Sequence, residues 1–323
     1  MYEPAGFGVS MVLMALCMLC WGSWANAFSL TRGKHRFELF YWDYAIGVLL
    51  GSLALAAWLG PASAIFHGSM DMGNAGWALL AGVVFNIGNV LLVAAVSLTG
   101  MSVAFPVCCG LALLIGVGLS WCIEPAVPGA PMAVGAILIL LSMIMDAAAY
   151  RAMSIQTKAS LRGIVIAIIG GLFMGAFPPC LQKALVGPEK LDPYAAAVML
   201  AAGVLLCTLA TNYLLMRRPI AGGEPVLMRA YFTAPITFHA LGIIGGAVWA
   251  AGGVLNFIAG GKVGMAISYA FGMGGVLVAA LWGVFVWREF RGAPRRSYHC
   301  LSAMFLLFAA GVAVIAWAKY TMQ

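Results

Sequence analysis

Charged side chains are scarce in this chain, and their scarcity excludes most soluble folds. Only 8% of its 323 residues are Asp, Glu, Lys or Arg, whereas soluble domains carry about 25%. Hydrophobic residues make up 64% of the chain, and its mean hydropathy is +1.02. Polar stretches long enough to build a soluble domain are also absent. The composition therefore predicts a polytopic helical membrane protein that works within a lipid bilayer, with no nucleic-acid partner.

Further absences narrow the class of membrane protein. No phosphate-binding loop of the form G-x-x-x-x-G-K-[ST] occurs, which argues against an ATP-driven pump. No Lys or Arg precedes the first apolar run, so we expect that run to stay in the protein as a helix. The apolar runs are continuous over about 20 residues, unlike the alternating strands of a membrane barrel. Most of the eight Cys lie inside these runs and should pack as small apolar side chains, so we expect no disulfide framework, metal or cofactor.

The apolar runs predict ten transmembrane helices with short connections. We expect them at 8–29, 38–58, 75–98, 101–122, 132–150, 161–185, 193–216, 235–258, 262–286 and 298–318.

The basic residues are divided unequally between the two sides of these helices. The connections after the first, fifth, seventh and ninth helices hold 13 of the 17 Lys and Arg, and the other side holds only Lys183, Lys190, Lys262 and Lys319. By the positive-inside rule the side with 13 is cytoplasmic, so both termini face outward. We expect a protein of the bacterial inner membrane, as a monomer or homodimer.

Two segments of the chain repeat at a constant spacing. FNIGNVLLVAAVSLTGMSVAF, at 85–105, matches WAAGGVLNFIAGGKVGMAISY, at 249–269, with identical residues at several positions, Gly100 and Gly264 among them. The spacing of about 164 residues corresponds to five helices. Because five is odd, the two halves, 1–150 and 151–323, should cross the membrane in opposite directions, an arrangement typical of alternating access.

Two motifs connect the chain with a known family. WGSWAN at 21–26 and RFELFYWDY at 36–44 resemble the drug/metabolite transporter superfamily, in the branch of the glucose/ribose porters and the plant ureide permeases. The resemblance implies ten helices in two inverted repeats and the transport of a small solute. One difference is the short connection at 151–160, where the plant ureide permeases carry a long central loop.

The second motif places an acid and a tyrosine at the head of the 38–58 helix. Intramembrane carboxylates are costly, so Asp43, with Tyr41 beside it, is a candidate proton-coupling or gating group. The alternative is structural: Asp43 accepts hydrogen bonds from neighbouring helices or pairs with Arg36 or Lys34. His239, on the 235–258 helix, we interpret as an interfacial residue.

Polar and aromatic side chains share helix faces elsewhere. Asn86 and Asn89 are three residues apart and offer amide donors and acceptors to a solute, or else bond between helices. Trp21 and Trp24 share a face, with Asn26 close behind, and are candidates for stacking on a planar solute or for core packing.

Two adjacent prolines lie inside the 161–185 helix. Pro178 and Pro179 remove backbone donors, so we expect this helix to be broken there and to form the wall facing the Trp21 cluster, with Phe177 and Gln182. Tyr269, the repeat counterpart of Phe105, completes the set of predicted solute contacts.

These observations predict a secondary transporter that takes up a sugar, ureide, nucleobase or nucleoside, driven by protons. No buried Arg or Lys cluster is available to balance an anionic solute. The alternative is an exporter of lipophilic or cationic compounds, which would need a carboxylate at mid-membrane. We expect no enzymatic activity and no catalytic residues, because His239 has no acidic or Cys neighbour on its own helix.

Overall fold

The computed structural model describes residues 2–61, 71–153, 160–219 and 224–322, and all the regular secondary structure in these ranges is helical. The helices are α1 (Phe7–Ser23), α2 (Asn26–Ser29), α3 (Phe37–Leu59), α4 (Met72–Thr99), α5 (Met101–Ile123), α6 (Gly129–Met153), α7 (Leu161–Leu185), α8 (Pro193–Arg217), α9 (Met228–Phe232), α10 (Ile236–Val263), α11 (Met265–Gly272), α12 (Gly275–Leu281), the π-helix η1 (Trp282–Val286) and α13 (Arg295–Tyr320).

The prediction of ten membrane-spanning helices is confirmed within these ranges. Ten helical segments are long and apolar enough to cross a bilayer, and their bounds lie within a few residues of those expected. Lipid-facing side chains explain why apolar residues cover these helices all round: Leu306 on α13, for example, is 72% exposed. The short connection at 151–160, with Lys158, lies mostly outside the described residues.

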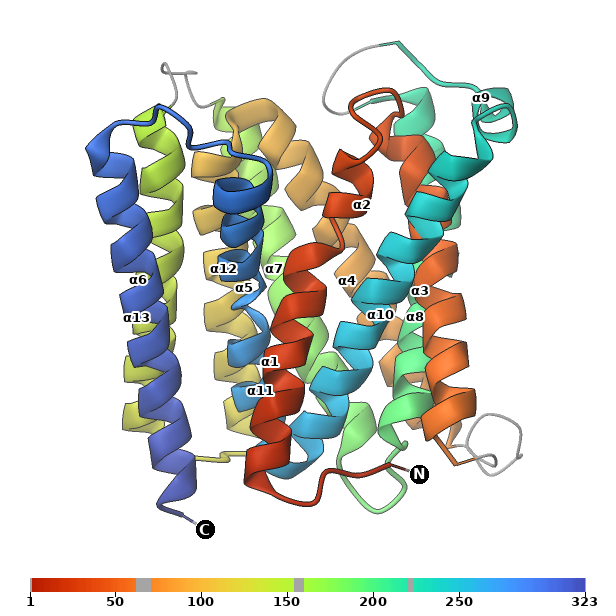
Figure 1. The fold of residues 1–323 in the computed structure, drawn as a ribbon. Helices are drawn as coiled ribbons and strands as arrows, with labels where there is room; N and C mark the ends of the chain where they lie inside the picture. The colour runs from red at the N-terminus through yellow and green to blue at the C-terminus, as the bar shows by residue number, and fades with distance from the viewer. Residues whose placement is uncertain (1, 62–70, 154–159, 220–223, 323) are drawn as a thin grey trace.

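Both ends of the chain lie at one face of the bundle, here called the terminal face (Figure 1). The short helix α9, which carries Arg229, lies at the opposite face. It is held there by a small apolar cluster in which Leu39, Trp42 and Met216 are buried beneath Met228 and Tyr231. The N-terminal segment is pinned at the terminal face, because Tyr2 N donates to Leu59 O at 2.9 Å.

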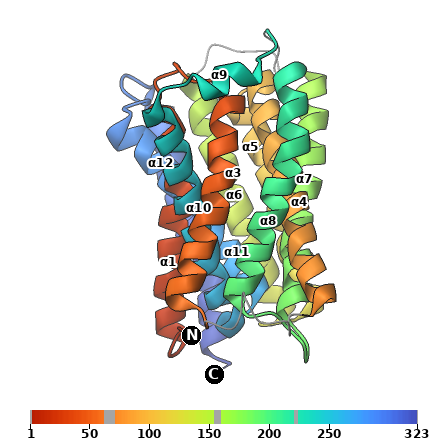
Figure 2. The ribbon, with the colours of Figure 1, turned by 90° about the vertical axis from the view of Figure 1, so that its right-hand side faces the viewer.

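Close helix contacts depend on glycine at two matching places. On α3 and α10, a Cβ at Gly47 would overlap the carbonyl oxygen of Ile243, and one at Gly246 would overlap that of Tyr44. On α4 and α8, Gly82 and Gly203 approach the partner backbone in the same reciprocal way, against Leu200 and Leu79. Small residues let membrane helices come this close. Figure 2 shows α3 between α10 and α8, and α3 packs on both of them.

The first helix of each half packs mainly on helices of the other half. In the first half, α1 packs on α10, α11 and α12; in the second, α7 packs on α4 and α5. α6 and α13 pack together at one side of the bundle, where Figure 1 shows them. Gly100 and Gly264, which are 164 residues apart, both have positive φ (79° and 101°) and each precedes a new helix. The repeat in sequence therefore coincides with a repeat in local backbone geometry.

The predicted break at Pro178 and Pro179 is wrong, because α7 runs without interruption from Leu161 to Leu185. Proline fits helical φ, and α7 packs closely on α5 just before the prolines, where a Cβ at Gly175 would meet Ile115 Cβ at 2.7 Å.

The helix breaks lie elsewhere. The first span is interrupted at Trp24 and Ala25, between α1 and α2, and the ninth at Met273 and Gly274, between α11 and α12. The ninth span ends in the π-helix η1, a form that often accompanies functional sites. Both interruptions border the cavity described next.

Candidate functional site

A cavity of about 190 Å³ lies between α1, α4, α7, α10 and the broken ninth span, and is called here the central cavity. Five of the eight predicted solute contacts line it: Trp21, Trp24, Asn89, Phe177 and Tyr269. Both helix breaks reach it, through Trp24 and Ala25 and through Gly272 and Met273. An apolar cavity of about 150 Å³ accommodates benzene, so the central cavity has room for one small ring with its substituents.

Aromatic rings form a continuous wall around the central cavity. Trp21 stacks on Trp249 with ring centroids 5.9 Å apart and an interplanar angle of 15°, and Trp21 Nε1 donates to Trp249 O at 3.2 Å. Phe85 contacts Trp249 at 4.5 Å between centroids and meets Phe177 edge-on at 5.3 Å. Phe177 meets Tyr269 edge-on at 5.6 Å. Such a wall is suited to the flat faces of a heterocycle. Sequence reasoning missed Trp249 and Phe85 as solute contacts, although they are the paired first residues of the two repeated segments, 85–105 and 249–269.

Asn89 supplies the amide of the central cavity, and its position is fixed by a buried network. Asn89 Nδ2 donates to Tyr41 Oη at 3.0 Å, and Tyr41 Oη donates to Asn86 Oδ1 at 2.8 Å. Thr208 Oγ1 also donates to Asn86 Oδ1, at 3.1 Å. Within the described part of the chain, Asn89 Oδ1 has no partner and is open to a solute N–H. Asn86 and Tyr41 are fully buried behind Asn89 and do not line the cavity.

Pro178 lies near Tyr269, which lines the central cavity. Pro178 has no N–H, so the carbonyl of Met174, four residues earlier, lacks its helical donor. Tyr269 Oη lies 3.5 Å from that carbonyl oxygen, at the long limit of a hydrogen bond. The proline thus leaves a carbonyl unpaired by the helix, as expected, although the helix does not break. The Tyr269 hydroxyl thus makes one long contact, with a carbonyl that has no helical donor.

Two predicted contacts lie away from the central cavity. Asn26 begins α2 beyond the first break, where its Nδ2 donates to Ser23 O at 3.0 Å and its Oδ1 accepts from Trp287 Nε1. Gln182 is fully buried on α7, and neither Nε2 nor Oε1 has a hydrogen-bond partner among the described residues. Gln182 lies between Phe177, which lines the central cavity, and Leu185, which lines a second cavity.

Asp43 is held by partners that the sequence did not reveal. The carboxylate is 2% exposed; its Oδ1 accepts from Tyr231 Oη at 2.7 Å, and its Oδ2 lies 2.8 Å from His239 Nδ1. Tyr231 and His239 meet edge-on at 4.7 Å. Burial, followed by the bond to Asp43, raises the pKa of the Tyr231 hydroxyl, which therefore stays protonated and donates.

Of the structural alternatives for Asp43, the structure has the contacts from neighbouring helices, whereas Arg36 pairs with Glu38 at 2.6 Å. His239 lies in the first turn of α10, at the end of the helix as expected, and has in Asp43 a partner that the sequence analysis did not give it. A span of 196 residues separates His239 from Asp43, so no local pattern could have paired them. They meet because α3 and α10 pack closely at this level, where a Cβ on Gly242 would overlap the Cβ of Asp43.

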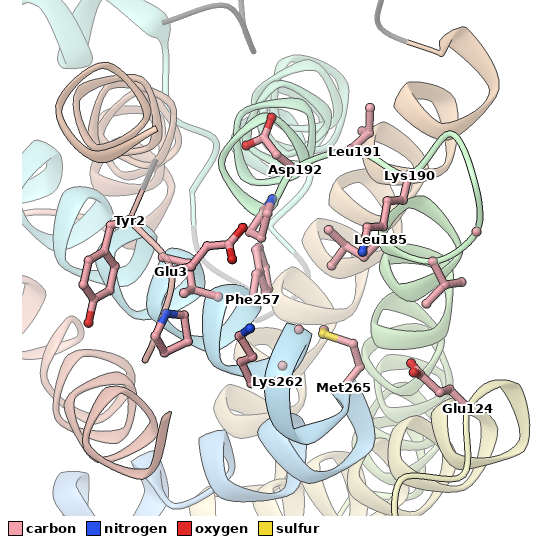
Figure 3. A pocket seen from close by; sticks show the side chains of 17 residues that line it. Tyr2, Glu3, Glu124, Leu185, Lys190, Leu191, Asp192, Phe257, Lys262 and Met265 are labelled. Carbon is pink, nitrogen blue, oxygen red and sulfur yellow. The ribbon is translucent and has the colours of Figure 1, made fainter. Parts of the chain in front are cut away.

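The second cavity, the terminal cavity, opens at the terminal face and has a volume of about 430 Å³ (Figure 3). It is larger than the central cavity, but it is peripheral and borders neither helix break. Its lining is mixed and includes the charged residues Glu3, Glu124, Lys190 and Lys262. The central cavity, by contrast, is lined by residues of both halves of the chain.

The described residues contain no group of three His, Cys, Asp or Glu side chains placed to hold a metal ion. All eight cysteines are free thiols.

Comparisons with known proteins agree with this architecture. The profile of the family described as "Ureide permease" matches residues 140–318, which is more than half of the chain. Ureide permease 1 and Ureide permease 2 of Arabidopsis thaliana are each 22% identical to this chain. Each match covers 98% of this chain, and it covers 97% of Ureide permease 1 and 98% of Ureide permease 2.

One solved crystal structure, whose title names no activity, covers 98% of this chain and 99% of its own with a TM-score of 0.64. At 18% identity it supports the fold alone. The family profile, by contrast, spans the second half of the bundle, from α6 to α13. The chain belongs to the ureide permease family.

Proposed function

We propose that this protein is a secondary active transporter that takes up a small, uncharged, polar ring compound through the central cavity. The observation that carries the proposal is the lining itself: aromatic rings, one amide with an open acceptor, and no charged side chain. A solute held there exchanges water for ring stacking and one or two directed hydrogen bonds. The named activity of the plant relatives, ureide permeation, fits this chemistry.

The size of the central cavity selects among the solutes expected from the sequence. A volume of about 190 Å³ suits the single ring of a cyclic ureide or a pyrimidine base better than a nucleoside, in which two rings are joined. A sugar offers hydroxyl groups at every edge, and the cavity presents few polar atoms to receive them. Cyclic ureides and nucleobases, which are flat and carry amide edges, are therefore the preferred solutes.

Alternating access follows from the proposed relation between the two halves, 1–150 and 151–323. The reciprocal glycine contacts of α3 with α10 and of α4 with α8 are counterparts under an inverted repeat, as are Gly100 and Gly264. Two inverted halves can exchange conformations and expose the same cavity to either side in turn. This relation also supports placement in the drug/metabolite transporter superfamily.

Coupling to protons is assigned to Asp43 with His239. A proton that binds to or leaves a buried carboxylate beside an imidazole changes the charge of the pair and so the contact that it makes. The pair joins α3 to α10, near the face that carries α9. With 13 of the 17 basic residues on that side, we place it in the cytoplasm, with both termini outside an inner membrane.

An exporter of lipophilic cations is the second candidate. It would need an acidic side chain in the central cavity to balance the cation, and the lining has none. We therefore favour uptake of neutral solutes.

Uptake of radiolabelled allantoin into proteoliposomes, with and without an inward proton gradient, tests the proposal. We expect accumulation only with the gradient, and competition by a free pyrimidine base. Equal uptake with and without the gradient would contradict the assignment of proton coupling to Asp43 and His239. Transport of a lipophilic cation, with no binding of ureides or bases, would establish the exporter.

A further inference from the structure

The terminal cavity contains charged side chains of both signs that have no ion-pair partner. Glu3, Glu124, Lys190 and Lys262 line it and are exposed, and no salt bridge joins any of them to another described residue. Figure 3 shows the ammonium group of Lys262 and the carboxylate of Glu3 in the same opening. Asp192 is already engaged, since its Oδ1 accepts from Tyr194 N and Ala195 N at the start of α8.

The cavity has a fixed wall and a fixed floor. Its wall includes the N-terminal segment, held by the bond from Tyr194 Oη to Tyr2 O at 3.1 Å. Its floor is apolar and includes Phe257 and Met265, which are 2% and 4% exposed. The helices that carry these two residues are joined by reciprocal hydrogen bonds, from Asn256 Nδ2 to Ser268 O at 2.8 Å and from Ser268 Oγ to Asn256 O at 2.7 Å.

Phe257 and Trp249, both on α10, line different cavities. A Cβ built on Gly253 would lie 3.7 Å from the ring of Phe257 and 3.9 Å from the ring of Trp249. Phe257 lines the terminal cavity, and Trp249 lines the central cavity. The two residues are eight apart on one face of α10, about 12 Å along the helix axis, with Gly253 between them.

We infer that the terminal cavity is a second binding site for the transported solute, separated from the central cavity by Phe257. The inference rests on the proposed function. A solute with both N–H donors and carbonyl acceptors can bond carboxylates and ammonium groups together, as a neutral cyclic ureide does. An anion would face Glu3 and Glu124, and a cation would face Lys190 and Lys262. The mixed lining therefore selects neutral solutes before they reach the aromatic cavity.

Equilibrium binding of radiolabelled allantoin to the purified full-length protein in nanodiscs tests the inference. We expect two sites per chain in the wild type. The double variant Lys262→Gln with Glu124→Gln should lose one site or bind it about tenfold more weakly. Asn89→Ala should weaken the other site by a similar factor. Lys319→Gln is the matched control on the terminal face, because Lys319 donates to Ala126 O outside the cavity.

The outcomes separate the two proposals. One site per chain that Asn89→Ala weakens, and that the double variant leaves unchanged, overturns the terminal site and keeps the proposed function. Absence of any ureide binding to the wild type overturns the proposed function and this inference with it.

The barrier has its own test. Phe257→Ala should speed the quenching of tryptophan fluorescence by added solute several-fold, since the route to the central cavity loses its barrier. Phe257→Leu is a smaller change, and its quenching rate should lie between those of the wild type and Phe257→Ala. An unchanged rate in both variants, with two sites still bound, would contradict the role of Phe257.

Discussion

His239 Nδ1 lies 2.8 Å from the buried Oδ2 of Asp43, and this contact joins α3 to α10 across 196 residues of sequence. Tyr231, from the short helix α9, completes the coordination of the carboxylate. The carboxylate of Asp43 thus joins three segments, α3, α9 and α10, near the face opposite the termini. A change of protonation at this pair would alter how α3 and α10 are held together, which is the step that a proton-driven transporter needs.

Replacing Asp43 by Asn should abolish accumulation driven by a proton gradient while changing the affinity for the solute less than about threefold. Asp43 does not line the central cavity, so equilibrium binding should survive. Proteoliposome uptake and equilibrium binding measure the two properties. His239→Gln should give the same separation. Because loss of one partner of a buried pair can cost about 3–5 kcal/mol, melting temperatures must accompany both variants. Equal losses of binding and accumulation would assign Asp43 to the solute site instead.

Asn89→Ala should weaken solute binding about tenfold, and Asn86→Ala should mainly lower stability. Asn89 lines the central cavity, whereas Asn86 is buried behind it and accepts from Tyr41 and Thr208. Removing Asn86 leaves the Tyr41 hydroxyl without its acceptor, at a cost of about 1–3 kcal/mol, whereas the Thr208 hydroxyl keeps Val204 O. Isothermal titration and thermal unfolding of both variants separate the roles. The prediction is wrong if Asn86→Ala costs more affinity than Asn89→Ala.

Trp21→Ala should reduce affinity for a ring solute by about 1–3 kcal/mol, the range found for loss of one aromatic stacking partner. Trp21 stacks on Trp249 in the wall of the central cavity. Trp317→Ala provides the control, because Trp317 is 69% exposed on α13, far from the lining. Binding isotherms measure the affinity of both variants for the solute. Equal affinities in the two would show that the aromatic wall only packs the core.

Gly82→Ala should lower the free energy of unfolding by about 1–3 kcal/mol, because its new methyl group would overlap the carbonyl of Leu200. Gly76→Ala, two turns earlier on α4, should raise it by about 0.5–1 kcal/mol, since that position is exposed and open. Thermal unfolding in detergent compares the pair. If both variants melt at the same temperature, α4 and α8 are not packed as closely as described.

Local hydropathy was sufficient to predict the spans, because each helix in a bilayer must satisfy its own backbone and needs about 20 apolar residues to do so. All ten spans lie within a few residues of their expected places. The motifs at 21–26 and 36–44 indicated the family, and the family profile confirms the ureide permease part of that prediction. Five predicted solute contacts line the central cavity because helix faces follow from spacing along the chain.

By itself, then, the sequence determined the class, the number of helices and the family. The tertiary structure alone decided which polar groups meet and where helices break. His239 reaches Asp43, and Trp249 reaches Trp21, only because α10 packs on α3 and α1. The prolines of α7 do not break it, whereas the ninth span breaks at Met273 and Gly274. Helix continuity depends on the balance between local backbone preference and packing, and packing is a property of residues far apart in sequence.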